Sequence, residues 1–427
     1  MQQPTTITAE PPPVREADQS PPPPRDGRII GVDAHPDTFT AAVFRGQTPH
    51  DARKLQVREA MDLAEFLRWA AAEFGKEDIF LLEAGLNSFE VASRLDLAGL
   101  RAIVLESCHV GRHAKTYADN DKLAAARIAL VYLAGNAPCV WQPDPATRER
   151  RELLHLHQRA VAENTAATNT LKSYLACLGI RPGKRNLCES KFRDWVLAQK
   201  PWSLLQKSLL EEYHSDLAES QARRKRLTQQ IAIEMSTQPQ MLRVLKLLGI
   251  GLINAFALLA IIGDIRRFTN PRKLVAYLGL NPGQRTSGSS KHITLGTGKR
   301  GRGDMRHLLI QGAQAVLNRR SGELAKWGWK LFARRGTRNI AVSAVARKIA
   351  VQVWHLLSGH PAQATESDKS HMLKLQKLAV LIGAKNRPQL GLGNSLKSAV
   401  EALLEKMNQA ARKASPPRPQ ETQSQPV

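Results

Sequence analysis

The stretch of the sequence best suited to chemistry is residues 282–292, PGQRTSGSSKH, where Ser287, Ser289 and Ser290 lie among glycines and basic residues. A serine hydroxyl attacks another centre only when a base, a metal ion or nearby cations assist it. The cations near this serine segment are Arg285, Lys291, Lys299, Arg300 and Arg302. Taken alone, the segment suits an ordinary loop, a phosphate-binding loop or a nucleophile.

A second set consists of acids at the ends of predicted elements. Asp33 closes a strand-like run that begins RIIGV, and Glu83 follows the apolar run IFLL. Carboxylates at adjacent strand ends can converge on one point, as a magnesium site for phosphoryl transfer requires. Asp121 opens a predicted helix and could reach the same point. Each acid also has an ordinary structural explanation. Asp33 could be a turn residue and Glu83 a surface carboxylate. Asp121 could be an acid at the N-terminus of a helix, where the helix dipole favours negative charge.

An apolar run at residues 247–263, LLGIGLINAFALLAIIG, precedes the serine segment. It falls short of the roughly 20 apolar residues that a membrane span needs, so we expect a buried helical hairpin. Its G-x-G turn, with Arg266 and Arg267 just beyond, resembles a helix-hairpin-helix element whose backbone amides face a DNA phosphate. A tight turn between two packed helices explains the glycines equally well.

The charge of the chain points to a polyanionic partner. Lys and Arg number 62 against 38 Asp and Glu, for a formal charge of +24. Between residues 265 and 322, twelve Lys or Arg accompany one acid, Asp304. Such a stretch, interrupted by glycines and helices, favours contact with a nucleic-acid backbone over a merely solvated face. The four cysteines are widely spaced, so we expect reduced thiols in a cytoplasmic protein without membrane association.

The elements that must position these residues fall into successive segments. The prolines of residues 1–27 predict a disordered, extended arm. Strands and helices alternate over residues 28–142, with a helix over residues 57–75, and predict an α/β domain with a central sheet. Residues 147–240 hold two long helices that pack on each other or on a second subunit. Residues 241–360 are mainly helical.

The remaining segment, residues 361–427, reads as a linker, a lone helix and a disordered tail.

The order of these motifs resembles the transposases of insertion-sequence family 110. The resemblance covers about residues 29–360 and is most specific in the ordered pattern IGDIRRF, LVAYLGLNP, SGSS, GKRG and RHLL. It implies a RuvC-like (ribonuclease H-like) N-terminal domain with an Asp-Glu-Asp-Asp set, a coiled-coil region and a C-terminal transposase domain with a nucleophilic serine. By this match Asp33, Glu83 and Asp121 are Mg²⁺ ligands, and Ser287 is the nucleophile.

The resemblance also implies partners. These are DNA, a structured bridge RNA that guides the enzyme, and further copies of the chain in a dimer or tetramer with shared active sites. We expect the nucleic acids to contact basic residues of the C-terminal domain, namely Arg266, Arg267, Arg285, Lys291, Lys299, Arg300, Arg302 and Arg306.

One position departs from the family pattern. The third and fourth acids are spaced D-x-x-D, so that both face the metal from one turn of a helix. Here Asp121 is present, but Ala124 stands in the fourth position. Asp119 points to a different face and suits a helix N-cap. Since losing even a supporting partner of a metal ligand costs about 10–100-fold in affinity or activity, this copy is either impaired or completed by water or Asp119.

The sequence therefore predicts a transposase that cleaves DNA through a metal-assisted phosphoserine intermediate. Two alternatives stay open. The chain could be a remnant that binds nucleic acid without catalysis, or a structure-specific nuclease that uses the acidic domain alone.

Overall fold

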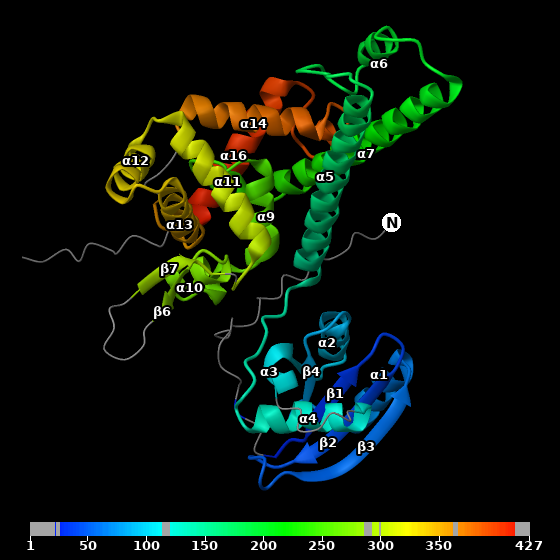
Figure 1. Cartoon of the computed structure of the whole chain (residues 1–427). Helices are drawn as coiled ribbons and strands as arrows, with labels where there is room; N and C mark the ends of the chain where they lie inside the picture. The colour runs from blue at the N-terminus through cyan, green and yellow to red at the C-terminus, as the bar shows by residue number, and fades with distance from the viewer. Residues whose placement is uncertain are drawn as a thin grey trace, which may run out of the picture. The chain divides into compact units, whose positions relative to one another are not determined.

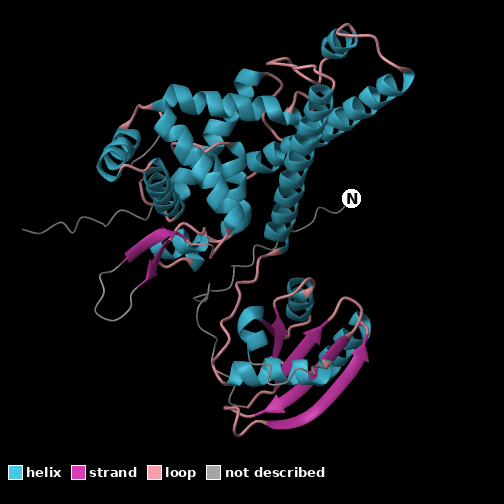
Figure 2. Ribbon diagram, in the orientation of Figure 1, coloured by secondary structure: helices cyan, strands magenta, loops and turns pink. Residues whose placement is uncertain are grey.

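The computed structural model describes residues 22, 26–112, 120–285, 293–298, 300–361 and 366–414. The chain forms two compact units, Met1–Asp144 and Pro145–Val427 (Figure 1). The N-terminal unit combines a sheet with helices, and the C-terminal unit is mainly helical (Figure 2). The predicted α/β class of the first part and the helical class of the second are thereby confirmed.

The N-terminal unit is built on a mixed five-stranded sheet with the order β3-β2-β1-β4-β5. The strands are β1 (Ile29–Ala34), β2 (Phe39–Arg45), β3 (Arg53–Met61), β4 (Ile79–Glu83) and β5 (Arg101–Leu105). Strand β1 pairs with β2 in antiparallel and with β4 in parallel orientation. The centre of the sheet is therefore the point where an antiparallel hairpin joins parallel strands.

Two layers of helix bury the faces of this sheet. Helices α1 (Leu63–Glu73) and α2 (Ser88–Leu97) share one apolar cluster with Ile30 and Val32 of β1. Helices α3 (Ser107–Arg112) and α4 (Asp121–Leu133) share the opposite cluster with Ile29. This alternation of β1 side chains between two apolar layers is what a central strand requires.

The helix predicted over residues 57–75 is wrong in its first part. Residues 57–61 belong to β3, which pairs with β2 in antiparallel orientation. Helix α1 begins only after Asp62, whose side chain accepts a hydrogen bond from the Glu65 amide. Pairing along the sheet edge has overridden the helix-like composition of this stretch.

Helix α4 crosses β1 at Gly31, and the crossing leaves no room for a side chain. A Cβ added to Gly31 would lie 2.0 Å from the carbonyl oxygen of Ala125 and 3.0 Å from the amide of Ala129, both on α4. Such contacts require the helix to move, since both atoms are backbone atoms. Gly31 therefore determines how close the N-terminal end of α4 lies to the sheet.

The C-terminal unit begins with two 33-residue helices, α5 (Pro145–Cys177) and α7 (Leu204–Ser236), separated by α6 (Ser190–Leu197). They pack along each other, with Leu171 and Leu217 in a shared cluster. Ser203 begins α7 with a capping box. Of the two sequence-based alternatives, packing of the long helices on each other is the one found.

The main core of this unit includes α9 (Leu252–Ile262), which is buried from Ala255 to Ile262 and packs against α5, α7, α8 and α11. The remaining elements of the unit are α8 (Pro239–Val244), η1 (Ile265–Arg267), α10 (Pro271–Tyr277), β6 (Pro282–Arg285), β7 (Ile293–Thr297), α11 (Gly303–Arg319), α12 (Glu323–Arg335), α13 (Arg338–Leu357), α14 (Asp368–Ile382), α15 (Asn386–Gln389) and α16 (Leu396–Ala414). By length and composition alone α13 could cross a membrane. Its Val345, Ile349 and Val353 are instead buried in the core of this unit.

The helix predicted within residues 361–427 is present as α16, but it is not alone, because α14 and α15 precede it in the same segment. Helix α16 packs on α8 and α14, and its Ala399, Leu403 and Met407 belong to the main core. The amphipathic pattern of the helix indicates this burial, since an apolar stripe must be covered. The residues after α13 therefore help to build the core.

We expect Gly31→Ala to loosen the crossing between β1 and α4, because the new methyl group has no space beside Ala125. Overpacking of this kind costs about 1–3 kcal/mol. Hydrogen-exchange mass spectrometry on the full chain should show lower protection of the α4 amides. Gly75→Ala is the matched control, since a Cβ there meets no atom within 4 Å. Equal protection in both variants would contradict the assigned role of Gly31.

Candidate active site

The two strand acids occupy neighbouring positions in the sheet. In the parallel pairing of β1 with β4, Val32 lies opposite Leu82. The next residues along the two strands are Asp33 and Glu83. Alternation assigns both to the same side as Leu81, whose cluster includes α4. The parallel register thus places the two strand-end acids at neighbouring positions of the sheet.

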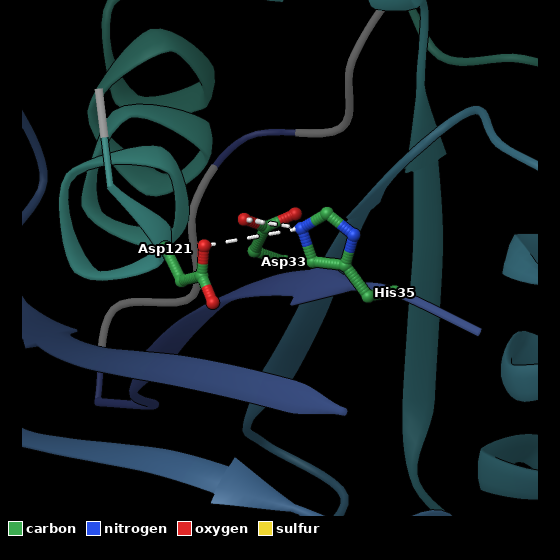
Figure 3. A group of neighbouring side chains, drawn as sticks. All are labelled: Asp33, His35 and Asp121. Carbon is green, nitrogen blue, oxygen red and sulfur yellow. Dashed lines mark ion pairs between the residues drawn. The ribbon is translucent and has the colours of Figure 1, made fainter. Parts of the chain in front are cut away.

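Three side chains meet at the N-terminal end of α4. One possible ligand atom from each of Asp33, His35 and Asp121 lies within 4.8 Å of the other two (Figure 3). The Nε2 atom of His35 is 3.6 Å from Asp33 Oδ2 and 3.9 Å from Asp121 Oδ1. Figure 3 shows the ring nitrogen facing both carboxylates. Glu83, although adjacent to Asp33 in register, is not part of this group of three.

Different elements hold the members of this cluster. Asp33 lies near the end of β1, and the backbone amide of His35 donates to the Thr38 carbonyl at 3.0 Å in the turn to β2. The His35 carbonyl accepts a 2.9 Å hydrogen bond from the Asn87 side chain, just before α2. Asp121 is the first residue of α4. The cluster therefore depends on the sheet and on both helix layers.

The N-cap of α4 is Asn120, whose side chain accepts a 2.9 Å hydrogen bond from the Leu123 amide. The expectation that Asp119 caps this helix is therefore wrong by one residue, and Asp119 itself lies outside the described residues. Ala124 follows one helical turn after Asp121 and is partly buried. Its methyl group offers no ligand, as the sequence predicts.

His35 is the member of the cluster that sequence reasoning missed. A single histidine followed by a proline does not form a recognisable metal-binding motif. The available signal was its spacing from Asp33, because residues two apart on an extended chain lie on one side. Two carboxylates and an imidazole suit a divalent metal ion. The side chains of Asp33, His35 and Asp121 are 23%, 56% and 55% exposed.

The basic residues of the C-terminal unit divide into exposed ones and ones that serve the fold. Arg266 is 58% exposed and pairs with Asp264 at 2.7 Å. Its neighbour Arg267 is buried and donates to the carbonyls of Ile261 and Ile262 at the end of α9. Burial holds the pKa of Arg267 below its ordinary value. Arg267 is therefore unsuited to the nucleic-acid contact that we expected of it.

Arg306 likewise serves the fold. Its guanidinium donates to the carbonyls of Gly279, Gly298 and Arg300, at 2.9, 2.8 and 3.2 Å. It thereby ties the segment after β7 to the end of α10. Arg302 is 39% exposed and pairs with Asp304, and this hydrogen bond raises the pKa of Arg302.

The serine segment begins with β6, which pairs with β7 in antiparallel orientation. Ser287, Ser289, Ser290, Lys291 and Lys299 lie outside the described residues, as does the side chain of Arg285. Arg300, which follows directly, is exposed. The roles predicted for these serines remain predictions.

The G-x-G turn before α9 is packed against another helix. Gly249 has a φ of +75°, and a Cβ there would lie 2.7 Å from the Gly312 carbonyl oxygen of α11. A Cβ on Gly312 would in turn lie 2.3 Å from the Gly249 carbonyl oxygen. The Lys374 ammonium donates to the carbonyls of Leu245, Leu247 and Ile250 around the turn. These contacts support the tight-turn alternative over a phosphate-binding hairpin.

Comparison with known proteins places the chain in a family. The model of the transposase IS116/IS110/IS902 family matches residues 241–327. A probable family 20 transposase of Pseudomonas aeruginosa is 30% identical over 253 residues, covering 57% of this chain and 74% of that protein.

Two transposases of named insertion sequences are also similar. That of element IS1111A from Coxiella burnetii is 30% identical, over 58% of this chain and 70% of that protein. That of IS1328 from Yersinia enterocolitica is 28% identical, over 52% of this chain and 67% of that protein. The chain belongs to the IS110 family of transposases, as the resemblance in the sequence indicates.

The neighbouring arginines of η1 should respond differently to replacement. Arg267→Met removes the hydrogen bonds that its guanidinium donates to the carbonyls of Ile261 and Ile262 at the end of α9, at a cost of about 1–3 kcal/mol. Arg266→Met removes an exposed group and should change stability by less than about 0.5 kcal/mol. Thermal unfolding of the two full-length variants compares them directly. Equal losses would show that Arg267 has no special structural role.

Proposed function

We propose that this transposase cleaves and rejoins DNA through a phosphoserine intermediate, with a divalent metal ion held by the N-terminal unit. The observation that carries the proposal is the convergence of Asp33, His35 and Asp121 at the end of β1. Membership of the family supports a DNA-recombining enzyme. The mixed sheet with helices on both faces supports a RuvC-like fold for the N-terminal unit.

The acids have separate duties in this proposal. Asp33 and Asp121 hold the metal ion, and Glu83 contributes from the adjacent strand position. An ion held there would supply charge stabilisation at the scissile phosphate. The partial exposure of the cluster leaves it accessible to a phosphodiester.

Ser287 is the proposed nucleophile. Its Oγ forms a bond to phosphorus while the bond to one bridging DNA oxygen breaks. The serine loses its proton, and the departing oxygen gains one to become a hydroxyl group. The new phosphoserine diester conserves the energy of the cleaved bond, so rejoining by another DNA hydroxyl needs no ATP. Cations near Ser287 in the sequence, Arg285 and Lys291 among them, would offset charge on the phosphate.

The partners follow from charge and family. DNA and a guiding bridge RNA would contact exposed cations through their backbones, which leaves sequence choice to base pairing. Arg266, Arg300 and Arg302 remain proposed contacts, together with Arg285, Lys291 and Lys299. Arg267 and Arg306 are omitted because their guanidinium groups bind backbone carbonyls. We further propose that the enzyme works as a dimer or tetramer in the cytoplasm.

A second candidate function is binding without catalysis. The observation in its favour is Ala124, which leaves α4 with one acid where the family pattern has two. A remnant of this kind would bind DNA and RNA but would form no covalent link.

Ser287→Ala should abolish covalent protein–DNA adducts, because no other hydroxyl takes over the attack. Adducts would be trapped with a nicked or suicide DNA substrate and separated on denaturing gels. Ser289→Ala is the matched control and should retain adducts. Adducts that persist in Ser287→Ala would remove the nucleophile assignment. Adducts absent even from the unaltered chain would favour the binding-only function.

Asp33→Asn should lower strand cleavage by at least about 10–100-fold, because it removes a carboxylate from the metal site. Affinity for DNA should change little, since Asp33 lies outside the basic C-terminal unit. Cleavage and filter-binding assays on the same preparation separate the two effects. Unchanged cleavage would place the chemistry elsewhere.

A further inference from the structure

We propose that His35 replaces the missing fourth acid as a metal ligand, and that the site consequently prefers a first-row transition ion over Mg²⁺. The inference rests on the proposed function, since it concerns the same site. It adds a ligand that the family pattern does not supply and a metal preference that follows from it.

The separations in the cluster fit a shared ion better than direct pairing. The distances of 3.6 and 3.9 Å from His35 Nε2 to the two carboxylate oxygens exceed hydrogen-bond length. Ligands held about 2.0–2.2 Å from one ion lie roughly 3 to 4 Å apart, depending on the coordination geometry. The separations of 3.6 and 3.9 Å between the imidazole nitrogen and the oxygens of Asp33 and Asp121 therefore lie within the range of a coordination shell.

The backbone of His35 is fixed independently of the two acids. Its amide donates to Thr38 and its carbonyl accepts from Asn87. These bonds fix the start of the side chain without using the ring. The ring nitrogen is therefore left to bind a metal ion placed between the carboxylates.

The location of His35 explains how it can substitute for position 124. A carboxylate at that position would approach from α4, one turn beyond Asp121. His35 instead approaches from the turn after β1, and its Nε2 lies 3.9 Å from Asp121 Oδ1 (Figure 3). The number of protein ligands is thus maintained, while an anionic oxygen is exchanged for a neutral nitrogen.

This exchange alters metal preference. Mg²⁺ binds oxygen ligands, and each negatively charged ligand increases its affinity. Losing a carboxylate therefore weakens Mg²⁺ binding. Imidazole nitrogen suits first-row transition ions, which retain affinity for a mixed nitrogen and oxygen set. Mn²⁺ is the practical probe, because it tolerates carboxylates as Mg²⁺ does and is paramagnetic.

The test is direct Mn²⁺ binding to the full chain without DNA, followed by electron paramagnetic resonance, with Mg²⁺ as competitor. His35→Ala should weaken Mn²⁺ binding by about 10–100-fold and leave the weaker Mg²⁺ binding nearly unchanged. His50→Ala, at an exposed histidine of the same unit, is the matched control and should bind as the unaltered chain does. Circular dichroism of each variant checks that it is folded.

A rescue variant sharpens the test. In His35→Ala combined with Ala124→Asp, binding should return, now with Mg²⁺ competing about 10-fold or more better than in the unaltered chain. Mn²⁺ affinity that is identical with and without His35 overturns the inference, as does an unaltered chain that binds no Mn²⁺. Failure of the proposed function is recognised separately, by cleavage that survives Asp33→Asn.

Discussion

The close crossing of α4 over β1 is the constraint on which the candidate site depends. Only a glycine at position 31 lets the backbone of Ala125 approach the strand so closely. Helix α4 begins at Asp121, and Asp33 lies two residues after Gly31 on β1. The close approach therefore determines the distance between these two carboxylates. The parallel register with β4 then adds Glu83 at the neighbouring position. A backbone contact thus fixes the distance between acids that lie far apart in the sequence.

Similar backbone contacts organise the C-terminal unit, where cations take part. The paired approach of Gly249 and Gly312 joins the turn before α9 to α11. Arg267, Arg306 and Lys374 each donate to two or more main-chain carbonyls. The formal charge of +24 therefore overstates the cationic surface presented to nucleic acid. Counting charges indicated the class of partner, but it did not separate Arg266 from Arg267.

Much of this architecture could be predicted from local patterns. Alternation gave β1 and β4, and the two long polar helices followed from their length and lack of glycine. Strand β3 was missed because its composition resembles the following helix, and only pairing with β2 decides its conformation. The amphipathic pattern of α16 indicates that one face is covered, but its partners α8 and α14 are set by long-range packing. His35 escaped notice because a lone histidine becomes informative only when the fold brings Asp121 beside it.

In the proposed mechanism the N-terminal unit binds a metal ion, with α4 setting the geometry of the site and His35 completing its ligands. The most direct test is anomalous X-ray diffraction from crystals of the full chain grown with Mn²⁺. The account predicts one strong anomalous peak bounded by the side chains of Asp33, His35 and Asp121. A peak elsewhere in the unit, or coordination by the two acids with His35 turned away, would contradict it.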